Sequence, residues 1–106
     1  MTEQIICAAI WYKDLVVKNH DVPLTHYLPN NIDTGLVFCG FRHTHCMYTM
    51  MQINGAKSTS HAGEEIQGFL TNHNRFVDRK EGAKIHQDNG GKLSYSRKTL
   101  YSEDLY

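Results

Sequence analysis

The sequence predicts an α+β fold, with a small antiparallel sheet and two main helices in a single domain spanning residues 1–106. Two observations carry this prediction. Strand-like runs occur in pairs along the chain, and a segment with helical spacing of apolar residues or with helix capping signals follows each pair. A length of 106 residues suits one domain and no more.

The first pair of strands lies in the N-terminal half. Residues 5–12 are apolar, aromatic and partly β-branched, which predicts a strand. Lys13-Asp14 is a possible turn that leads into residues 15–17, so this strand could be one arm of a hairpin. Prolines, asparagines and a glycine then mark residues 19–35 as an irregular excursion, and residues 36–41 form the second short strand.

The first helix is predicted from about residue 43 to residue 53. Its apolar side chains recur one turn apart, as in an amphipathic helix: Cys46, Met47, Met50 and Met51.

The second pair of strands is predicted as a hairpin at residues 68–77, with Asn72-His73-Asn74 as its turn. Asp78 is a good N-cap, and Glu81 stands three residues after it, as in a capping box. A helix should follow from about residue 79 to residue 87.

Two glycine positions bear on this second helix. Asn89-Gly90-Gly91 would end it with a left-handed cap. Gly82-Ala83 lies inside it, where a small pair either permits close approach of another backbone or is simply tolerated at the surface.

Composition restricts the kinds of ligand. Eleven basic and eleven acidic side chains cancel, whereas a protein that binds DNA or RNA polymers normally carries a basic excess. An anionic ligand should therefore be small and held by a local group of cations. The odd number of cysteines, three, argues against a disulfide framework and for a reducing compartment. The N-terminal residues do not resemble a signal peptide, and no apolar run is long enough for a membrane span.

Residues 68–84 mix aromatic and cationic side chains in a pattern that suits a nucleotide. Aromatic rings can stack on a base, guanidinium groups can bind phosphate oxygens, and amides can read a base edge or ribose hydroxyls. A helix that begins near Arg79 adds free backbone N–H groups. The alternative is a hairpin with core aromatics and surface arginines. The candidates here are Phe69, Asn74, Arg75, Phe76 and Arg79.

A second group of candidates lies elsewhere. Arg42 and His43 occupy a strand-to-helix junction, and Arg97, which follows a Gly-Gly pair, could reach over a neighbouring pocket or be solvated. Two other hypotheses concern the same junction. Residues 39–46 contain two cysteines and two histidines but lack the paired spacing of a structural zinc site. His43-Thr44-His45 resembles half of an H-x-T phosphodiesterase, which needs a second copy of the motif.

Three blocks of the sequence resemble, in the same order, the first family of Thoeris anti-defence proteins. They are G-x-R-H at residues 40–43, G-F-x-T-x-x-x-R-F-V-D-R-x-E at residues 68–81 and L-Y-S-E-D-L-Y at residues 100–106. The sequence departs from the family at Gly82, where alanine is usual, and at His86, where a small residue is usual.

The resemblance implies a function. Members are phage proteins that bind a cyclic ADP-ribose, including its glycocyclic form, which a bacterial TIR-domain enzyme makes from NAD as an immune signal. They sequester this signal without cleaving it and need neither cofactor nor metal. They are compact α+β proteins that assemble as homo-oligomers, here a dimer or hexamer, in the cytoplasm of the infected bacterial cell. Some also bind cyclic di- or trinucleotides of the CBASS defence.

The resemblance also implies roles for the candidate residues. Phe69 or Phe76 would stack on adenine, Arg75 and Arg79 would meet the diphosphate, and Asn74 would touch base or ribose. Arg42 and His43 would line the same or a second pocket, and Arg97 is added to the nucleotide-binding set. No residue is expected to be catalytic.

Overall fold

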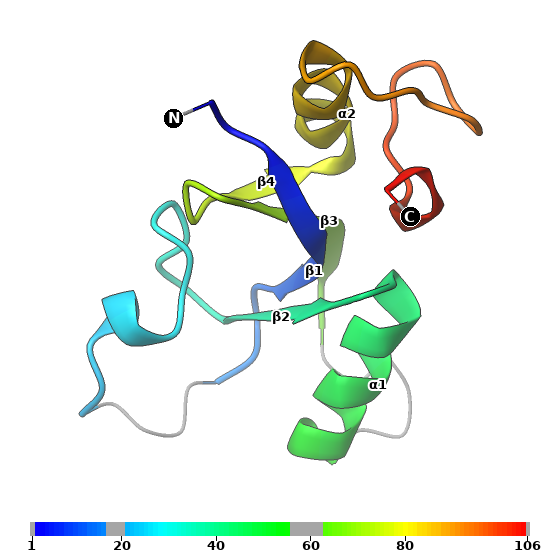
Figure 1. Cartoon of the computed structure of the whole chain (residues 1–106). Helices are drawn as coiled ribbons and strands as arrows, with labels where there is room; N and C mark the ends of the chain where they lie inside the picture. Colours follow the sequence, from blue (N-terminus) through cyan, green and yellow to red (C-terminus); the bar gives the residue numbers. More distant parts are fainter. Residues whose placement is uncertain (1, 17–20, 56–62, 106) are drawn as a thin grey trace.

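The computed structural model describes residues 2–16, 21–55 and 63–105. Its centre is a four-stranded antiparallel sheet with the order β2-β1-β3-β4. Helix α1 follows β2 along the chain, and helix α2 follows β4 (Figure 1). The predicted α+β class with two main helices is confirmed. The element bounds are β1 (Ile5–Tyr12), β2 (Leu36–Gly40), α1 (His43–Asn54), β3 (Glu65–Thr71), β4 (Phe76–Asp78) and α2 (Arg79–Asp88).

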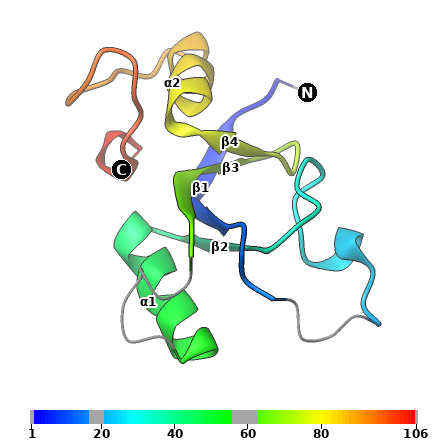
Figure 2. The same cartoon turned by 180° about the vertical axis from the view of Figure 1, so that it is seen from behind.

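Both helices and the C-terminal segment cover one face of the sheet, as Figures 1 and 2 show from opposite sides. Alternate residues of β1 point to this face, because successive side chains of a strand lie on opposite sides. They are fully buried against the apolar sides of the helices. The core on this face consists of Ala8, Ile10, Tyr12, Cys46, Met50, Phe69, Val77, Ala83 and Leu100.

The excursion between β1 and β2 covers the opposite face. It contains a short 3-10 helix, η1 (Leu24–His26), and its two apolar anchors are Leu28 and Ile32. These residues pack with Ala9 and Phe76 in a second cluster. The irregular segment predicted from its prolines therefore acts as a layer of the fold rather than as a free loop.

The predicted hairpin turn, the Asp78 N-cap and the left-handed residue after α2 are confirmed, whereas the Glu81 side chain, which a capping box would use, lies 3.5 Å from Arg75 Nη2. The backbone N–H groups of Thr71 and Asn74 close the turn between β3 and β4, and Asn74 takes a left-handed conformation with φ 55°. The Asp78 carboxylate accepts a hydrogen bond from the backbone N–H of Glu81 at 2.8 Å. At the other end of α2, Gly90 adopts φ 85°, which glycine tolerates without steric cost.

Three details differ from the sequence prediction. Leu15 and Val16 lie outside the sheet, so no second hairpin arm forms from the described part of residues 15–17; Val17 is outside the described residues. Phe41 lies beyond the end of β2. The neighbours of Gly82 are side chains of the same chain and not another backbone: a Cβ there would lie 3.0 Å from Phe69 Cδ2 and 3.4 Å from Leu100 Cδ2.

The C-terminal segment follows α2 back to the edge of the helical layer and ends in a 3-10 helix, η3 (Ser102–Asp104). Its anchor is Leu100, which is fully buried and whose backbone N–H binds the Arg79 carbonyl at 3.0 Å. None of the described helices combines the length and apolar character required to cross a bilayer.

Candidate functional site

Arg79 stands where three parts of the fold meet: the end of β4, the first turn of α2 and the C-terminal segment. Its Nη1 donates a hydrogen bond to the Leu100 carbonyl oxygen at 2.7 Å, and its Nη2 donates to the Gln67 side-chain oxygen. Gln67 comes from β3. The guanidinium is therefore fixed by backbone and amide oxygens of two segments distant in sequence.

Two tyrosines extend this arrangement. The Arg79 guanidinium lies over the Tyr101 ring, with 4.7 Å between Cζ and the ring centroid, and Tyr101 meets Tyr95 edge to face with centroids 6.0 Å apart. Tyr95 is 68% exposed and Tyr101 is 36% exposed. We call the group formed by Gln67, Arg79, Tyr95, Leu100 and Tyr101 the Arg79 site.

The charge of Arg79 has no carboxylate partner within the described part of the chain. The four ion pairs found there involve Lys13, Arg75 and His73 on the basic side. Burial lowers the pKa of Arg79, against the opposing effects of Tyr101 and Glu103. A half-buried guanidinium stays charged in proteins, so an anion that reached it would restore a missing counter-charge.

His43 supports Arg79 from α1. Its Nε2 lies 2.8 Å from the Gly68 carbonyl oxygen, so Nε2 carries the ring proton and Nδ1 presents a lone pair to Arg79 Nη2 at 3.4 Å. Burial lowers the pKa of His43, and the neighbouring Arg79 charge lowers it further, while the Gly68 carbonyl opposes them. Neutral His43 therefore helps to hold the guanidinium in place.

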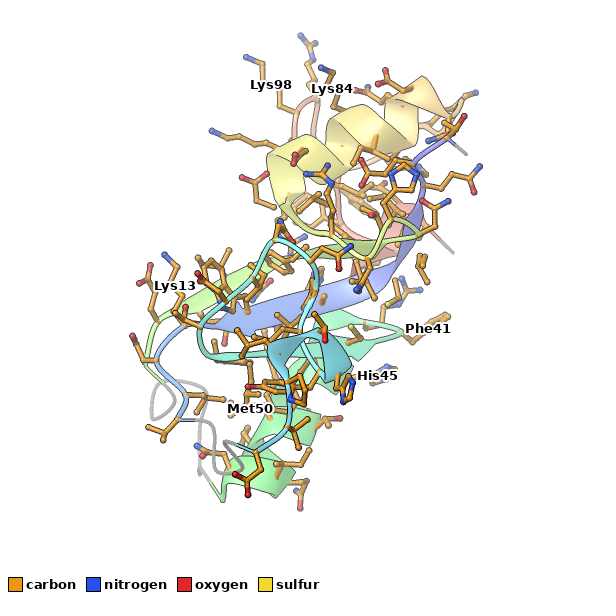
Figure 3. All side chains as sticks on the ribbon, turned by 90° about the vertical axis from the view of Figure 1, so that its left-hand side faces the viewer. Lys13, Phe41, His45, Met50, Lys84 and Lys98 are labelled. Atoms are coloured by element: carbon orange, nitrogen blue, oxygen red, sulfur yellow. The ribbon has the colours of Figure 1, made fainter. Side chains whose placement is uncertain are left out.

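Arg97 lies beyond the tyrosine pair. It lines a cavity of 380 Å³ together with Tyr95, Leu93 and neighbouring residues of the C-terminal segment, and with Gln87 of α2. Figure 3 shows Lys84 and Lys98 extending from this same end of the molecule. Tyr95 belongs both to this cavity and to the Arg79 site and so links the two.

Arg75 has different surroundings from Arg79, although both belong to the predicted set. Its Nε and Nη2 bind the two carboxylate oxygens of Glu3 at 2.8 and 2.9 Å, and Nη2 also lies 3.5 Å from Glu81. Two carboxylates thus neutralise this guanidinium. The contact to Glu3 spans 72 residues of sequence, so local sequence patterns did not predict it.

Phe69 and Phe76 lie on opposite faces of the sheet. In the β3–β4 register Phe69 pairs with Val77 and Phe76 pairs with Leu70, so the two rings alternate. Phe69 is fully buried under the helices, where its ring meets His43 edge to face at 5.2 Å. Phe76 is 6% exposed and packs beneath the excursion. Both rings serve the core of this chain, and they do not share a site.

Asn74 and Arg42 also lie apart from the Arg79 site. Asn74 fastens the excursion to the hairpin: its carbonyl accepts from the Asn30 N–H at 2.7 Å, and its amide donates to the Asn30 side chain at 3.2 Å. The Arg42 guanidinium lies 4.6 Å from the Phe41 ring centroid at the start of α1. Of the eight predicted residues, the structure brings together His43, Phe69 and Arg79, with Arg97 joined to them through Tyr101 and Tyr95.

The two histidines of the H-x-T motif have different environments. His43 is 7% exposed and uses both ring nitrogens, whereas His45 is exposed and accepts a hydrogen bond from the Arg42 N–H at 3.3 Å. Figure 3 shows His45 beside Phe41, away from the end that carries the lysines. Within the described ranges, no three histidine, cysteine or acidic side chains are grouped so that they could hold a metal ion.

Sequence reasoning did not select Gln67, Tyr95 or Tyr101. Tyr101 belongs to the closing heptapeptide, whose unusual sequence was one signal of the family resemblance, and Tyr95 stands in a stretch rich in cations. The position of these two tyrosines near arginines and lysines in the sequence could therefore have identified them as candidate site residues. Gln67 carried none, because a polar residue on a strand is commonly solvated.

Comparison with known protein families gives a match over most of the chain. A family model described as "Phage T4 y16D protein" matches residues 4–106. That description names a phage protein and no activity or ligand. Neither the curated proteins nor the solved structures contain a match to the chain.

Proposed function

We propose, from the premise that the chain belongs to the phage T4 y16D protein family, that it captures a nucleotide immune signal at the Arg79 site and holds it intact. The signal would be a cyclic ADP-ribose made by a bacterial TIR-domain enzyme, as the resemblance to Thoeris anti-defence proteins implies. Binding at this site would keep the signal from its receptor in the infected cell.

The observation that carries this proposal is the state of the Arg79 guanidinium. It is half-buried, it is held by neutral oxygens on two sides and no carboxylate of the described residues pairs with it. A diphosphate supplies the charge that this group lacks, and the Arg79 N–H groups not used by Leu100, Gln67 and His43, among them Nε–H, can donate to its oxygens. Hydrogen bonds to a charged group contribute about 1.5–3 kcal/mol each.

The tyrosine pair supplies the second requirement, a surface for a base. The exposed ring of Tyr95 lies next to Tyr101, and stacking of one base on an aromatic ring contributes about 1–3 kcal/mol. Arg97, at the cavity beyond Tyr95, would bind a second phosphate or a ribose. A sponge that competes with a receptor needs a dissociation constant near nanomolar, about −12 kcal/mol, which requires these contacts to act together on one bound molecule.

Capture without chemistry is favoured by the surroundings of His43. Acid–base cleavage of a phosphodiester needs histidines that can exchange protons with the substrate. His43 instead holds its Nε2 proton on the Gly68 carbonyl and turns Nδ1 to Arg79. The alternative, a small phosphodiesterase that uses His43 and His45, gains no support from these positions.

Two further parts of the proposal concern assembly and place. The protein would form a homo-oligomer, a dimer or hexamer, and Phe41, Tyr48 and Ile53 expose apolar area beside and along α1 that such an assembly would cover. It would act in the cytoplasm of the infected bacterium. It would bind neither DNA nor RNA polymers and would need no cofactor.

The proposal is tested by comparing two arginine variants in a calorimetric titration with purified cyclic ADP-ribose. Arg79→Lys keeps the positive charge but removes the forked donors, and we expect it to weaken binding by about 1.5–3 kcal/mol, roughly 10- to 150-fold. Arg75→Gln should leave the dissociation constant within about twofold, because Glu3 and Glu81 already neutralise Arg75.

Lys80→Ala is the matched control, since Lys80 is an exposed cation in the same turn of α2. Circular dichroism must show that each variant is folded at the titration temperature. Equal binding by the wild type and by Arg79→Lys, or a loss confined to Arg75→Gln, would remove the Arg79 site from the proposal.

A further inference from the structure

Cys7 and Cys39 lie on neighbouring strands and face the same side of the sheet. In the β1–β2 register Ala9 is the partner of Cys39, and Cys7 is two residues before Ala9 on the same face. The Cys39 thiol donates a hydrogen bond to the Cys7 sulfur, and the Gly40 backbone N–H donates another. The two thiols are therefore diagonal neighbours on one face of the sheet.

The three cysteines of the chain differ in their readiness to ionise. The hydrogen bond from Cys39 lowers the pKa of Cys7 to about 7, against the effect of burial, and Gly40 lowers it further. The same bond raises the pKa of the donor, Cys39. Burial raises the pKa of Cys46 to about 12. Since the thiolate is the nucleophile, Cys7 is the reactive member of the set.

Both thiols can be reached from outside the core. Cys39 is exposed and Cys7 is half-buried, whereas Cys46, a residue of α1, is fully buried against the sheet. Cys39 also lines a cavity of 280 Å³ between the sheet and the excursion, and the wall of this cavity includes Leu70, the partner of Cys7 in the β1–β3 register. This space admits a molecule as small as hydrogen peroxide.

We propose that Cys7 and Cys39 form an oxidation site that takes peroxide. The Cys7 thiolate attacks one peroxide oxygen, the O–O bond breaks, and the departing hydroxide takes a proton to leave as water. Cys7 is then a sulfenic acid. The Cys39 sulfur attacks the Cys7 sulfur, the S–O bond breaks, and the Cys39 proton leaves with the hydroxide as a second water. The product is a disulfide, formed by loss of two electrons to the peroxide.

The expected disulfide is readily reversed. Diagonal positions on antiparallel strands lie about 7–8 Å apart, beyond the usual Cα separation of about 4.4–6.8 Å in disulfides, so closure requires a backbone shift. The ladder between β1 and β2 ends at Ala8 and Gly40, and β1 changes register against β3 between Ile5 and Cys7, so the required shift would fall at the irregular end of the β1 pairing. Such a bond ties the edge strand β2 to β1 under oxidising conditions.

The test exposes the folded wild-type protein to graded hydrogen peroxide at pH 7, blocks free thiols with N-ethylmaleimide and maps the peptides without reduction. We expect an intramolecular Cys7–Cys39 link that dithiothreitol reverses, with Cys46 still free. In Cys39→Ser the reaction should stop at a Cys7 sulfenic acid, which dimedone traps. In Cys7→Ser no link should form, and Cys39 should resist the same peroxide concentration.

Alkylation of Cys7 by iodoacetamide should rise with a midpoint near pH 7, and Cys39→Ala should move that midpoint upward, because alanine cannot donate the hydrogen bond that a serine hydroxyl would keep. The proposal is overturned if Cys39 is oxidised before Cys7, if links join only different molecules, or if dimedone fails to label Cys7 in Cys39→Ser at peroxide concentrations that convert methionine to its sulfoxide.

Discussion

Arg75 and Arg79 are four residues apart in the sequence, yet they have opposite electrostatic surroundings. Arg75 makes a forked ion pair with Glu3 and a longer contact with Glu81. Arg79 is held by the Leu100 carbonyl and the Gln67 amide and lies on a tyrosine ring. The candidate anion site thus depends on which arginine lacks a carboxylate, a property set by residues far away in the sequence.

The contacts of His43 require its neutral ring, so this single residue should make the free energy of unfolding depend on pH. Its pKa in the folded protein lies below 6.5, the value of the free side chain, so the unfolded chain binds more protons just below that pH. Stability should be fully present above pH 6.5 and should decline as the pH falls from there towards the lower folded pKa. Denaturant unfolding at pH 7.5, 6.5 and 5.5 measures this decline.

His43→Gln should reduce that pH dependence, since glutamine does not titrate. The control is His45→Gln, on the exposed side of the same helix. A wild-type free energy of unfolding that stays constant between pH 7.5 and 5.5, or an equal change in both variants, would contradict the assigned role of His43.

The elements followed their local signals closely. The turn residues at 72–74, the Asp78 cap and the left-handed residue near Gly90 all lie where predicted, because each depends on a few neighbouring side chains. The sequence also allowed the faces of the hairpin to be predicted. Its short turn pairs Phe69 with Val77 and Phe76 with Leu70, and this register places the two rings on opposite faces of the sheet. Treating the rings as alternatives for one site overlooked this alternation.

The N-cap of α2 can be tested directly. Asp78→Ala removes the acceptor for the Glu81 N–H and should lower the free energy of unfolding by about 1 kcal/mol, whereas Asp78→Asn should keep most of it. Chemical denaturation at pH 7 is the measurement. Asp88→Ala, at the opposite end of α2, is the control and should not destabilise, because an acidic residue there opposes the helix dipole. Equal losses in Asp78→Ala and Asp88→Ala would argue against the cap.

At the scale of the whole molecule, contacts between residues near the chain ends and residues in the middle of the chain determine which polar side chains are already paired. Glu3 binds Arg75 and Thr71 of the hairpin, the Asn89 amide binds the Glu3 carbonyl, and Leu100 seals the space between α2 and the sheet. These contacts join positions up to 86 residues apart, and no local pattern contains them. This is why the class of fold was predictable while the composition of the candidate site was not.

Glu3 should therefore contribute to acid stability. The hydrogen bond from Arg75, helped by Thr71 against the effect of burial, lowers the pKa of Glu3 from 4.5 to about 2. Its contribution should be present above pH 4.5 and should disappear as the pH falls towards 2. Glu3→Gln should cost about 1 kcal/mol at pH 7, the upper end for a partly exposed pair.

Urea denaturation of Glu3→Gln at pH 7 and pH 3 provides the measurement, and the difference from the wild type should shrink at the lower pH. Glu64→Gln is the matched control, because its exposed pairing with Lys13 at 3.9 Å should contribute little. Identical behaviour of the two variants would argue against a special role for Glu3.

The central claim is that the protein holds a phosphate-bearing signal and leaves it intact. The most direct measurement incubates the folded protein with a limiting amount of purified cyclic ADP-ribose, removes unbound ligand, denatures the protein by heat and analyses the released molecule by mass spectrometry. The account predicts full recovery of the unaltered cyclic compound from the wild type and reduced retention by Arg79→Lys. Recovery of a linear or cleaved product, or no retention by the wild type, would contradict it.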